Sequence, residues 1–204
     1  MIRPASIVAA FAASLVLAAP GAAQKVVKQQ SIPTIGAPQL LDTTGMFRDR
    51  YAKVGDDMFI GGQPTEKALR EMKAQGVTTV VNLRTPPEME RIGFDEAKLV
   101  SELGMKYVYI PMRGNDQFPY SPAELKRFSE VMASADGKVL LHCTVAWRAS
   151  HLWGAYLIQQ GVPAEEALKH TRAINLMDEH RMTSDGKQPI EQFLGKPVPG
   201  LGRP

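Results

Sequence analysis

The stretch VLLHCTVAWRAS, residues 139–150, places the one cysteine of the 204-residue chain directly after an apolar run. The run KVLLH, 138–142, has the length and the apolar side chains typical of a buried strand. Arg148 follows Cys143 by five positions, and 149–160 has the pattern of a helix. The stretch therefore predicts a strand and a helix joined by a short loop that carries a thiol and a guanidinium.

Short apolar runs alternate with helical patterns through the middle of the chain. Further strands are predicted at 78–83 and 106–111, with a weaker one at 58–60. Helices are predicted at 65–75, 94–103, 121–134 and 164–177. Strands separated by helices predict an α/β fold, with a parallel-type central sheet and helices on both faces.

Three chemically useful groups follow three of the predicted strands. Arg84 follows 78–83, the loop 112–120 with Asp116 follows 106–111, and Cys143 follows 138–142. In parallel sheets, ligands bind beyond the carboxyl ends of the strands. We therefore expect these groups to converge on one edge of the sheet.

The position of Cys143 just before a helix has chemical consequences. The N-terminus of a helix favours bound anions and favours thiolate over thiol. Arg148 adds a planar fork of donors that suits two oxygens of a phosphate. The competing interpretation is a packed core residue, because free cysteine is among the most buried residue types. The nearby arginine and helix start favour a nucleophile that faces an anion.

Composition excludes some partners. The formal net charge is +3, and no run of lysines and arginines with interleaved aromatic residues occurs. The charge pattern of a nucleic-acid-binding protein is therefore missing, and no nucleic acid partner is expected. The histidines show no metal-ligand spacing, so neither a metal nor a cofactor is expected.

The two ends of the chain differ from its middle. Residues 1–23 have the pattern of a secretory signal peptide with cleavage after Ala23, and the apolar stretch 5–19 is shorter than the roughly 20 residues that span a bilayer. We expect an exported protein, periplasmic or secreted, without a stable membrane anchor after cleavage. A linker or N-terminal arm is predicted at 24–50, the folded domain at 51–195 and a flexible tail at 196–204.

Two segments carry a resemblance to a known superfamily. HCTVAWRAS, 142–150, resembles the phosphate-binding loop of the protein tyrosine and dual-specificity phosphatases. FIGGQPTEKALREMKAQGVTTVVNLRTPPEME, 59–90, is similar to the bacterial branch of beta-lactamase-hydrolase-like phosphatases. The resemblance covers about 51–177 and implies a cysteine-phosphatase-like fold. The loop has four residues between cysteine and arginine where most of the superfamily has five, and it lacks the usual mid-loop glycine, so a left-handed turn there would fall on another residue.

The resemblance implies a role for each residue of the site. Cys143 would attack phosphorus and form a phosphocysteine. Asp116 would protonate the leaving oxygen. His142 would orient the loop from behind, and Ser150 occupies the position of the hydroxyl that stabilises the thiolate. Phosphate oxygens would be held by Arg148 and by the backbone amides of the loop residues Thr144, Val145, Ala146 and Trp147.

Three points stay open in the sequence. Arg84 either lines the rim of the pocket or pairs with Glu88. The substrate is either a protein bearing phosphotyrosine or phosphoserine or a small-molecule phosphate. A rhodanese-type sulfurtransferase with a Cys143 persulfide, or a catalytically inactive phosphate-binding module, is an alternative to the phosphatase.

Overall fold

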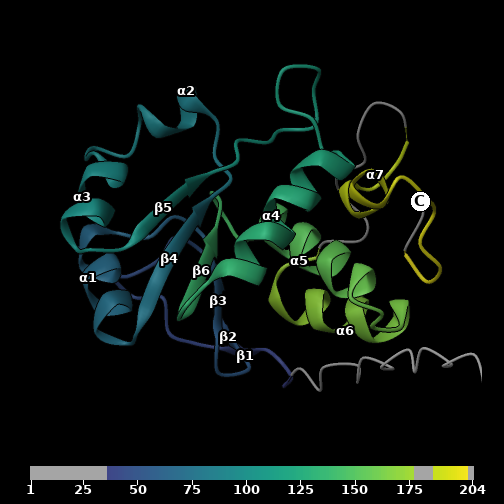
Figure 1. The fold of residues 1–204 in the computed structure, drawn as a ribbon, viewed down its shortest axis with the longest axis horizontal. Coiled ribbons are helices and arrows are strands. Elements are labelled where there is room, and N and C mark those ends of the chain that lie inside the picture. Colours follow the sequence, from purple (N-terminus) through teal and green to yellow (C-terminus); the bar gives the residue numbers. More distant parts are fainter. Residues whose placement is uncertain (1–35, 177–185, 202–204) are drawn as a thin grey trace, which may run out of the picture. The chain divides into compact units, whose positions relative to one another are not determined.

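The computed structural model describes residues 36–176 and 186–201, which form a mixed sheet with helices on both faces (Figure 1). The predicted signal peptide lies outside the described residues. Within them the sheet has six strands in the order β1-β2-β3-β6-β4-β5. The strands are β1 (Gln39–Leu40), β2 (Tyr51–Val54), β3 (Met58–Gly61), β4 (Val77–Asn82), β5 (Lys106–Tyr109) and β6 (Lys138–His142).

Four neighbouring strands are parallel, and two more extend the sheet antiparallel. β3, β6, β4 and β5 form the parallel part, whereas β2 pairs antiparallel with β3, and β1 with β2. Strand β6 therefore lies between β3 and β4, in the interior of the sheet. The predicted parallel-type sheet is confirmed, and the antiparallel edge adds to it.

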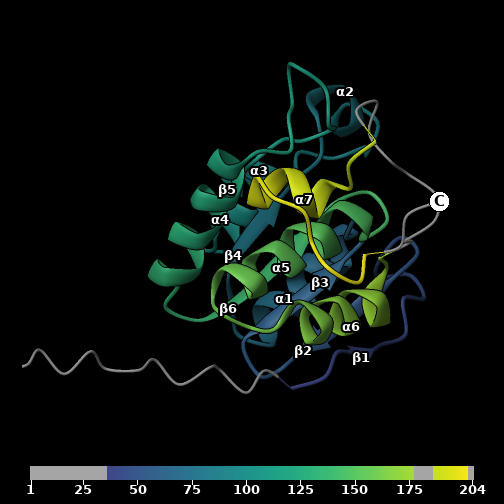
Figure 2. The ribbon, with the colours of Figure 1, turned by 90° about the vertical axis from the view of Figure 1, so that its right-hand side faces the viewer.

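Two groups of helices cover the two faces (Figures 1 and 2). The helices are α1 (Glu66–Ala74), α2 (Pro86–Met89), α3 (Glu96–Glu102), α4 (Pro122–Ser134), α5 (Trp147–Gln159), α6 (Ala164–Ile174) and α7 (Pro189–Leu194). Helices α1 and α3 pack on one face, and α4 to α7 gather on the other, where α5 contacts β3 and β6. The predicted α/β class with helices on both faces is confirmed.

Side chains of β6 alternate between the two apolar cores, as the period of a strand requires. Leu140 belongs to the core beneath α1 and α3, whereas Val139, Leu141 and Cys143 belong to the core beneath α4 to α7. The alternation therefore sets the side of the sheet on which the thiol emerges, which is the side of α5.

Capping residues fix several helix starts close to the predicted positions. The side chains of Thr65, Asp95 and Ser121 accept hydrogen bonds from backbone N–H groups at the starts of α1, α3 and α4. Helix α5 begins at Trp147, two residues earlier than predicted. Helix α6 ends at Ile174, while the predicted end at 177 lies outside the described residues.

Two short helices, α2 and α7, were absent from the sequence prediction. Each begins with proline, and each has a capping box in which a glutamate three residues after the N-cap reaches back to it. Such short helices show too little apolar periodicity to be predicted from the pattern alone.

Both ends of the described chain pack on the domain. Phe47 stacks on Tyr51 with ring centroids 4.1 Å apart. Val198 and Leu201 are buried in the core beneath α4 to α7, and the Val198 N–H donates to Glu191 at 3.1 Å. The segment expected as a flexible tail is therefore packed as far as Leu201, because its apolar side chains find a core that its proline and glycine content does not reveal.

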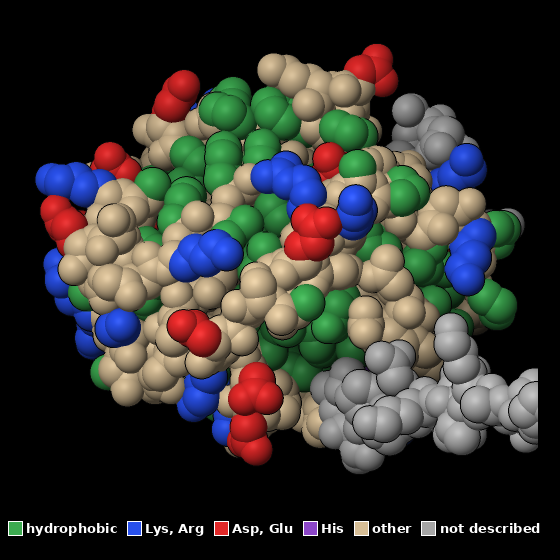
Figure 3. All heavy atoms as spheres, in the orientation of Figure 1, with side chains coloured by type: hydrophobic (Ala, Val, Ile, Leu, Met, Phe, Trp, Pro, Cys, Tyr) green, Lys and Arg blue, Asp and Glu red, His purple; other side chains and the backbone are tan. Residues whose placement is uncertain are grey.

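The surface carries both signs of charge. Figure 3 shows Lys and Arg side chains interspersed with Asp and Glu side chains on one face. In the described ranges, no helix combines the length and the apolar character that crossing a membrane demands.

Strand register aligns the carboxyl ends of the parallel strands. Gly61 and Asn82 lie opposite His142 on either side, and Tyr109 lies opposite Asn82. The four parallel strands therefore end in one row, and the segments that leave them start side by side.

Candidate active site

The loop 143–148 begins at this row and is joined to the end of β3. The N–H of Cys143 donates to the Gly61 carbonyl at 3.3 Å, and the N–H of Gln63 donates to the Thr144 carbonyl at 3.1 Å. Cys143 is only 1% exposed. The thiol therefore lies at the bottom of the loop, at the end of the sheet, rather than on the surface.

Gly62 permits this close packing. A Cβ atom at position 62 would lie 1.8 Å from the Arg48 carbonyl oxygen and 2.9 Å from that of Thr144. Only glycine fits between these two backbones. The second glycine of the GGQP motif is thus explained by the approach of three chain segments behind the loop.

The carbonyl oxygens of three successive loop residues accept hydrogen bonds from residues outside the loop. The Thr144 oxygen accepts from Gln63, the Val145 oxygen from the Asn175 side chain, and the Ala146 oxygen from the Ser150 hydroxyl at 2.9 Å. A carbonyl oxygen that faced an anion would repel it. Holding these oxygens in other hydrogen bonds leaves the loop suited to bind one.

Ala146 adopts a left-handed backbone with φ 63° and is the N-cap of α5. The expectation that a left-handed turn would fall on a residue other than glycine is therefore confirmed. The turn allows Trp147 and Arg148 to start the helix only four residues after the cysteine, which explains the early start of α5.

Arg148 is almost fully buried and makes five hydrogen bonds at the end of the sheet. Its Nη1 donates to the carbonyls of Leu83 at 3.2 Å and Met112 at 2.8 Å, and to Oε2 of Glu88 at 2.9 Å. Its Nη2 donates to Oε1 of Glu88 at 2.7 Å and to the Thr144 hydroxyl at 2.9 Å. Burial alone would lower the pKa of Arg148, but the neighbouring Cys143 and Glu88 raise it above its ordinary value, so the charge is permanent.

Glu88 is the carboxylate that holds this guanidinium. It also accepts from the hydroxyls of Thr144 at 2.8 Å and Thr85 at 2.9 Å, and from Arg113 at 3.3 Å. Burial alone would raise the pKa of Glu88, but hydrogen bonds from Arg148 and Thr85 lower it well below its ordinary value. Glu88 is therefore ionised at neutral pH.

His142 lies behind the loop in a fully buried polar cluster. Its Nε2 is 2.9 Å from Oε1 of Glu96, which also accepts from the Asn82 amide at 2.9 Å. The second Glu96 oxygen accepts from Gln63 at 2.6 Å. Burial alone would raise the pKa of Glu96, but His142 and these amides lower it below its ordinary value. His142 therefore lies buried behind the loop, with its Nε2 held by Glu96.

Arg84 lines the pocket beside the loop and makes no ion pair with the Glu88 carboxylate. It donates to the Gln63 side-chain oxygen and, at 2.7 Å, to the backbone carbonyl of Glu88. The rim position, one of the two alternatives, is therefore the one in the structure. Burial lowers the pKa of Arg84 from its ordinary value.

The Ser150 hydroxyl is placed differently from the role that the resemblance implied, and the Trp147 side chain packs in the core. The buried Ser150 donates its hydroxyl proton to the Ala146 carbonyl, so that proton is not directed at the thiolate. Trp147 is 7% exposed and packs edge-on against His151 with ring centroids 4.5 Å apart. In this conformation Ser150 supports the loop, and the Trp147 ring lies in the core.

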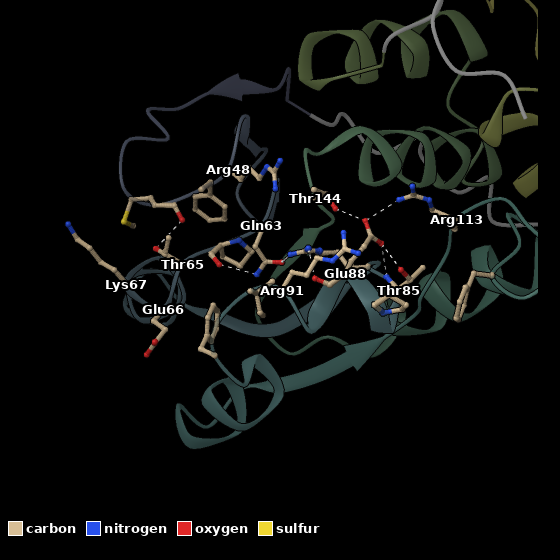
Figure 4. A pocket seen from close by; sticks show the side chains of 18 of the residues that line it. Arg48, Gln63, Thr65, Glu66, Lys67, Thr85, Glu88, Arg91, Arg113 and Thr144 are labelled. Carbon is tan, nitrogen blue, oxygen red and sulfur yellow. Dashed lines mark hydrogen bonds and ion pairs between the residues drawn. The ribbon is translucent and has the colours of Figure 1, made fainter.

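A pocket of about 1070 Å³ opens beside Thr144 (Figure 4). The loop after β5 contributes Asn115 and Gln117 to its lining, whereas the exposed Asp116 between them is not part of it. The two ends of this loop, Met112 and Tyr120, lie close to Arg148 and the thiol loop. Met112 binds Arg148, and burial raises the pKa of Tyr120 to about 12, with further effects from Arg148 and Cys143.

Sequence reasoning missed Gln63, Glu88 and Glu96 as site residues. A signal for Glu88 exists, because Thr85-Pro-Pro-Glu88 has the spacing of a capping box. Nothing in the sequence pairs Glu96 with His142, since their contact depends on tertiary packing. Across 36–176 and 186–201, no cluster of three or more histidine, cysteine or acidic side chains is arranged to hold a metal ion.

Comparisons with known proteins identify a family and a fold. A family model described as DSP-PTPase phosphatase fused to NAD+ Kinase matches residues 40–191. The beta-lactamase hydrolase-like protein of Agrobacterium fabrum is 30% identical over 108 residues, which cover 51% of this chain but 24% of that protein. The chain thus spans about a quarter of that relative's length.

Two solved structures share the fold. PTPMT1 is 19% identical with a TM-score of 0.55, covering 71% of this chain and 90% of its own. TpbA of P. aeruginosa is 17% identical with a TM-score of 0.55, covering 81% of this chain and 94% of its own. At these identities the likeness establishes the fold.

Replacing Glu88 by glutamine should destabilise the domain. Arg148 would lose the charge that compensates its burial, and we expect the free energy of unfolding in urea to fall by about 1–3 kcal/mol at pH 7. Because the pKa of Glu88 is lowered on folding, this stabilisation exists above its ordinary pKa of 4.5 and is lost as the pH falls through the lowered value.

The matched control is Glu130→Gln, which removes an exposed pair with Lys126 at 3.7 Å. It should change the free energy of unfolding by less than about 0.5 kcal/mol. Equal effects of the two substitutions would show that Glu88 does not hold Arg148 in solution.

Ala146→Gly should cost less stability than Ala149→Gly, although both side chains are fully buried. Glycine in the helix at position 149 loses about 1 kcal/mol of helix propensity and about 0.8 kcal/mol of methyl burial. At position 146, the N-cap, only the methyl burial is lost, and the relief of a left-handed backbone, about 1–2 kcal/mol, offsets it. Urea unfolding of both variants measures the difference, and equal losses would contradict the left-handed turn.

Proposed function

The chain belongs to the family described as DSP-PTPase phosphatase fused to NAD+ Kinase, and from that premise we propose that it hydrolyses phosphate monoesters by cysteine-dependent catalysis. The observation that carries the proposal is the loop 143–148. It joins a buried thiol to a permanently charged guanidinium, and its carbonyl oxygens are held in other hydrogen bonds.

In the proposed reaction, the Cys143 sulfur attacks phosphorus as a thiolate. An S–P bond forms, the P–O bond to the substrate breaks, and the leaving oxygen takes up a proton. Water then attacks phosphorus, the S–P bond breaks, and inorganic phosphate leaves while the thiolate is restored. Arg148 and the loop amides stabilise the charge on the transferred group.

To bind a phosphate through two donors, Arg148 has to exchange some of its hydrogen bonds, because both Nη atoms donate to groups within the chain. Its two Nη atoms already share the Glu88 carboxylate and the Thr144 hydroxyl in a fork geometry. In our proposal Glu88 fixes the plane of the guanidinium while the phosphate approaches from the loop side. Glu88 is then a positioning residue, and His142 is another.

Asp116 is our candidate for the proton donor. Glu88 is unsuited to the role, because its lowered pKa keeps it ionised. The loop that carries Asp116 is anchored at the site through Met112 and presents the adjacent Asn115 and Gln117 to the pocket. In our proposal, substrate binding brings Asp116 in from its exposed position.

The purified chain should release phosphate from 4-nitrophenyl phosphate and should form no thiocyanate from thiosulfate and cyanide. Cys143→Ser should abolish phosphate release. Arg148→Lys keeps the charge but loses the paired donors, so kcat/KM should fall by about 10²-fold or more with the fold intact by circular dichroism. Thiocyanate formation without phosphate release would make the protein a sulfurtransferase, and activity in neither assay would make it a binding module.

Asp116→Asn tests the proton donor separately. General acid catalysis contributes about 10²–10⁴-fold and matters most for poor leaving groups. The substitution should therefore slow an alkyl phosphate far more than 4-nitrophenyl phosphate, and it should remove the fall in rate at high pH. Equal slowing of both substrates, with the pH profile intact, would show that Asp116 acts only on the shape of its loop.

A further inference from the structure

The pocket beside the loop collects positive charge. Its lining includes five cationic side chains and two acidic ones, so this one surface carries a charge excess as large as the +3 of the whole chain. The cations are Arg48, Lys67, Arg84, Arg91 and Arg113, and the acids are Glu66 and Glu88. A concave site of one sign attracts and concentrates anions of the other.

The four arginines of the pocket fall into two groups. Arg84 and Arg113 are engaged by Gln63 and Glu88 within the chain. For Arg48 and Arg91, by contrast, no ion pair with an acidic side chain occurs among residues 36–176 and 186–201. Both side chains are exposed, so a ligand can reach them.

Arg48 also lies close enough to Arg84 for the two charges to repel each other. Burial is the main cause that lowers the pKa of Arg84; attraction to Glu88 raises it, and repulsion from Arg148 and Arg48 lowers it. Cations that repel one another around a cavity are relieved when an anion enters it. The scissile phosphate accounts for Arg148 but not for Arg48 and Arg91.

The positions in Figure 4 separate these two arginines from the catalytic end. Thr144, Glu88 and Arg113 lie at one end of the pocket, and Thr65 and Lys67 lie at the other. Arg48 and Arg91 lie between the two ends. A group bound by these arginines would therefore lie to one side of the phosphate loop.

Apolar side chains form part of the pocket wall, together with the charged side chains. Pro87, Ile92, Phe94 and Phe118 line the pocket together with the arginines. The volume of about 1070 Å³ is far larger than a phosphate ion needs and lies at the upper end of pockets that hold small molecules. The pocket thus offers room for a carbon skeleton between two anionic groups.

We propose that Arg48 and Arg91 form a second anion subsite, and that the substrate is a small phosphate monoester that carries a second phosphate-like group beyond the scissile one. The proposal deepens the phosphatase function proposed above and rests on it. A small molecule is favoured over a peptide, because the charges and the apolar wall line a single cavity.

A matched pair of substrates tests the subsite. 4-(Phosphonomethyl)phenyl phosphate and 4-methylphenyl phosphate have similar leaving groups, and only the first has a second anion, which cannot be hydrolysed. We expect kcat/KM to favour the phosphonate by about tenfold or more at low salt, and the preference should shrink as ionic strength rises.

The double variant Arg48→Gln, Arg91→Gln should lower kcat/KM for the phosphonate at least about tenfold more than for the methyl compound. The control Lys126→Gln removes an exposed cation on α4 that does not line the pocket, and it should keep the full preference. A wild-type preference near one, or a preference that the double variant retains, would overturn the subsite.

Two further measurements separate the possible failures. If 4-methylphenyl phosphate is not hydrolysed at all, the phosphatase function fails. In that case the subsite is tested by calorimetry. Binding of the phosphonate to Cys143→Ser is compared with its binding to Cys143→Ser that also carries Arg48→Gln and Arg91→Gln. If the arginine substitutions instead slow only the hydrolysis of a phosphotyrosine peptide with acidic flanking residues, and not that of a peptide with flanking alanines, the small-molecule assignment is wrong.

Discussion

The ion pair between Arg148 and Glu88 is the interaction on which the site depends. Through it, the first turn of α5 is joined to the short helix α2, and the same guanidinium binds the segments that follow β4 and β5 through the carbonyls of Leu83 and Met112. A buried guanidinium is stable only when its charge and donors are satisfied. The pair therefore fixes the arginine and, through Thr144, the loop that carries the thiol.

Backbone features also position the loop that carries the thiol. Ala146 accepts a left-handed conformation so that α5 can start immediately after a short loop, and Gly62 allows the β3 end to support that loop from behind. The polar cluster of His142, Glu96 and Gln63 then ties β6 to α3 and to the GGQP segment. Each of these features has a local energetic cost or restricts which residue fits, and the packing of the surrounding fold maintains it.

Much of this arrangement could be predicted from the sequence, because it depends on local patterns. The strand before Cys143 and the helices with capping residues follow from periodicity and spacing. The left-handed turn at a residue other than glycine follows from the resemblance of the loop to that of the cysteine phosphatases. The partners of Arg148 and His142 could not be predicted, since Glu88 and Glu96 reach them through tertiary packing. The burial of Val198 and Leu201 was missed for the same reason, as their proline- and glycine-rich segment shows no periodicity.

The central claim is that Cys143 transfers the phosphoryl group covalently. Rapid denaturing quench of the chain during turnover of 4-nitrophenyl phosphate, followed by mass spectrometry of the peptide that contains Cys143, tests it directly. The account predicts one phosphoryl group on Cys143 early in the reaction and none in Cys143→Ser. Steady phosphate release with an unmodified Cys143 at every time point would contradict it.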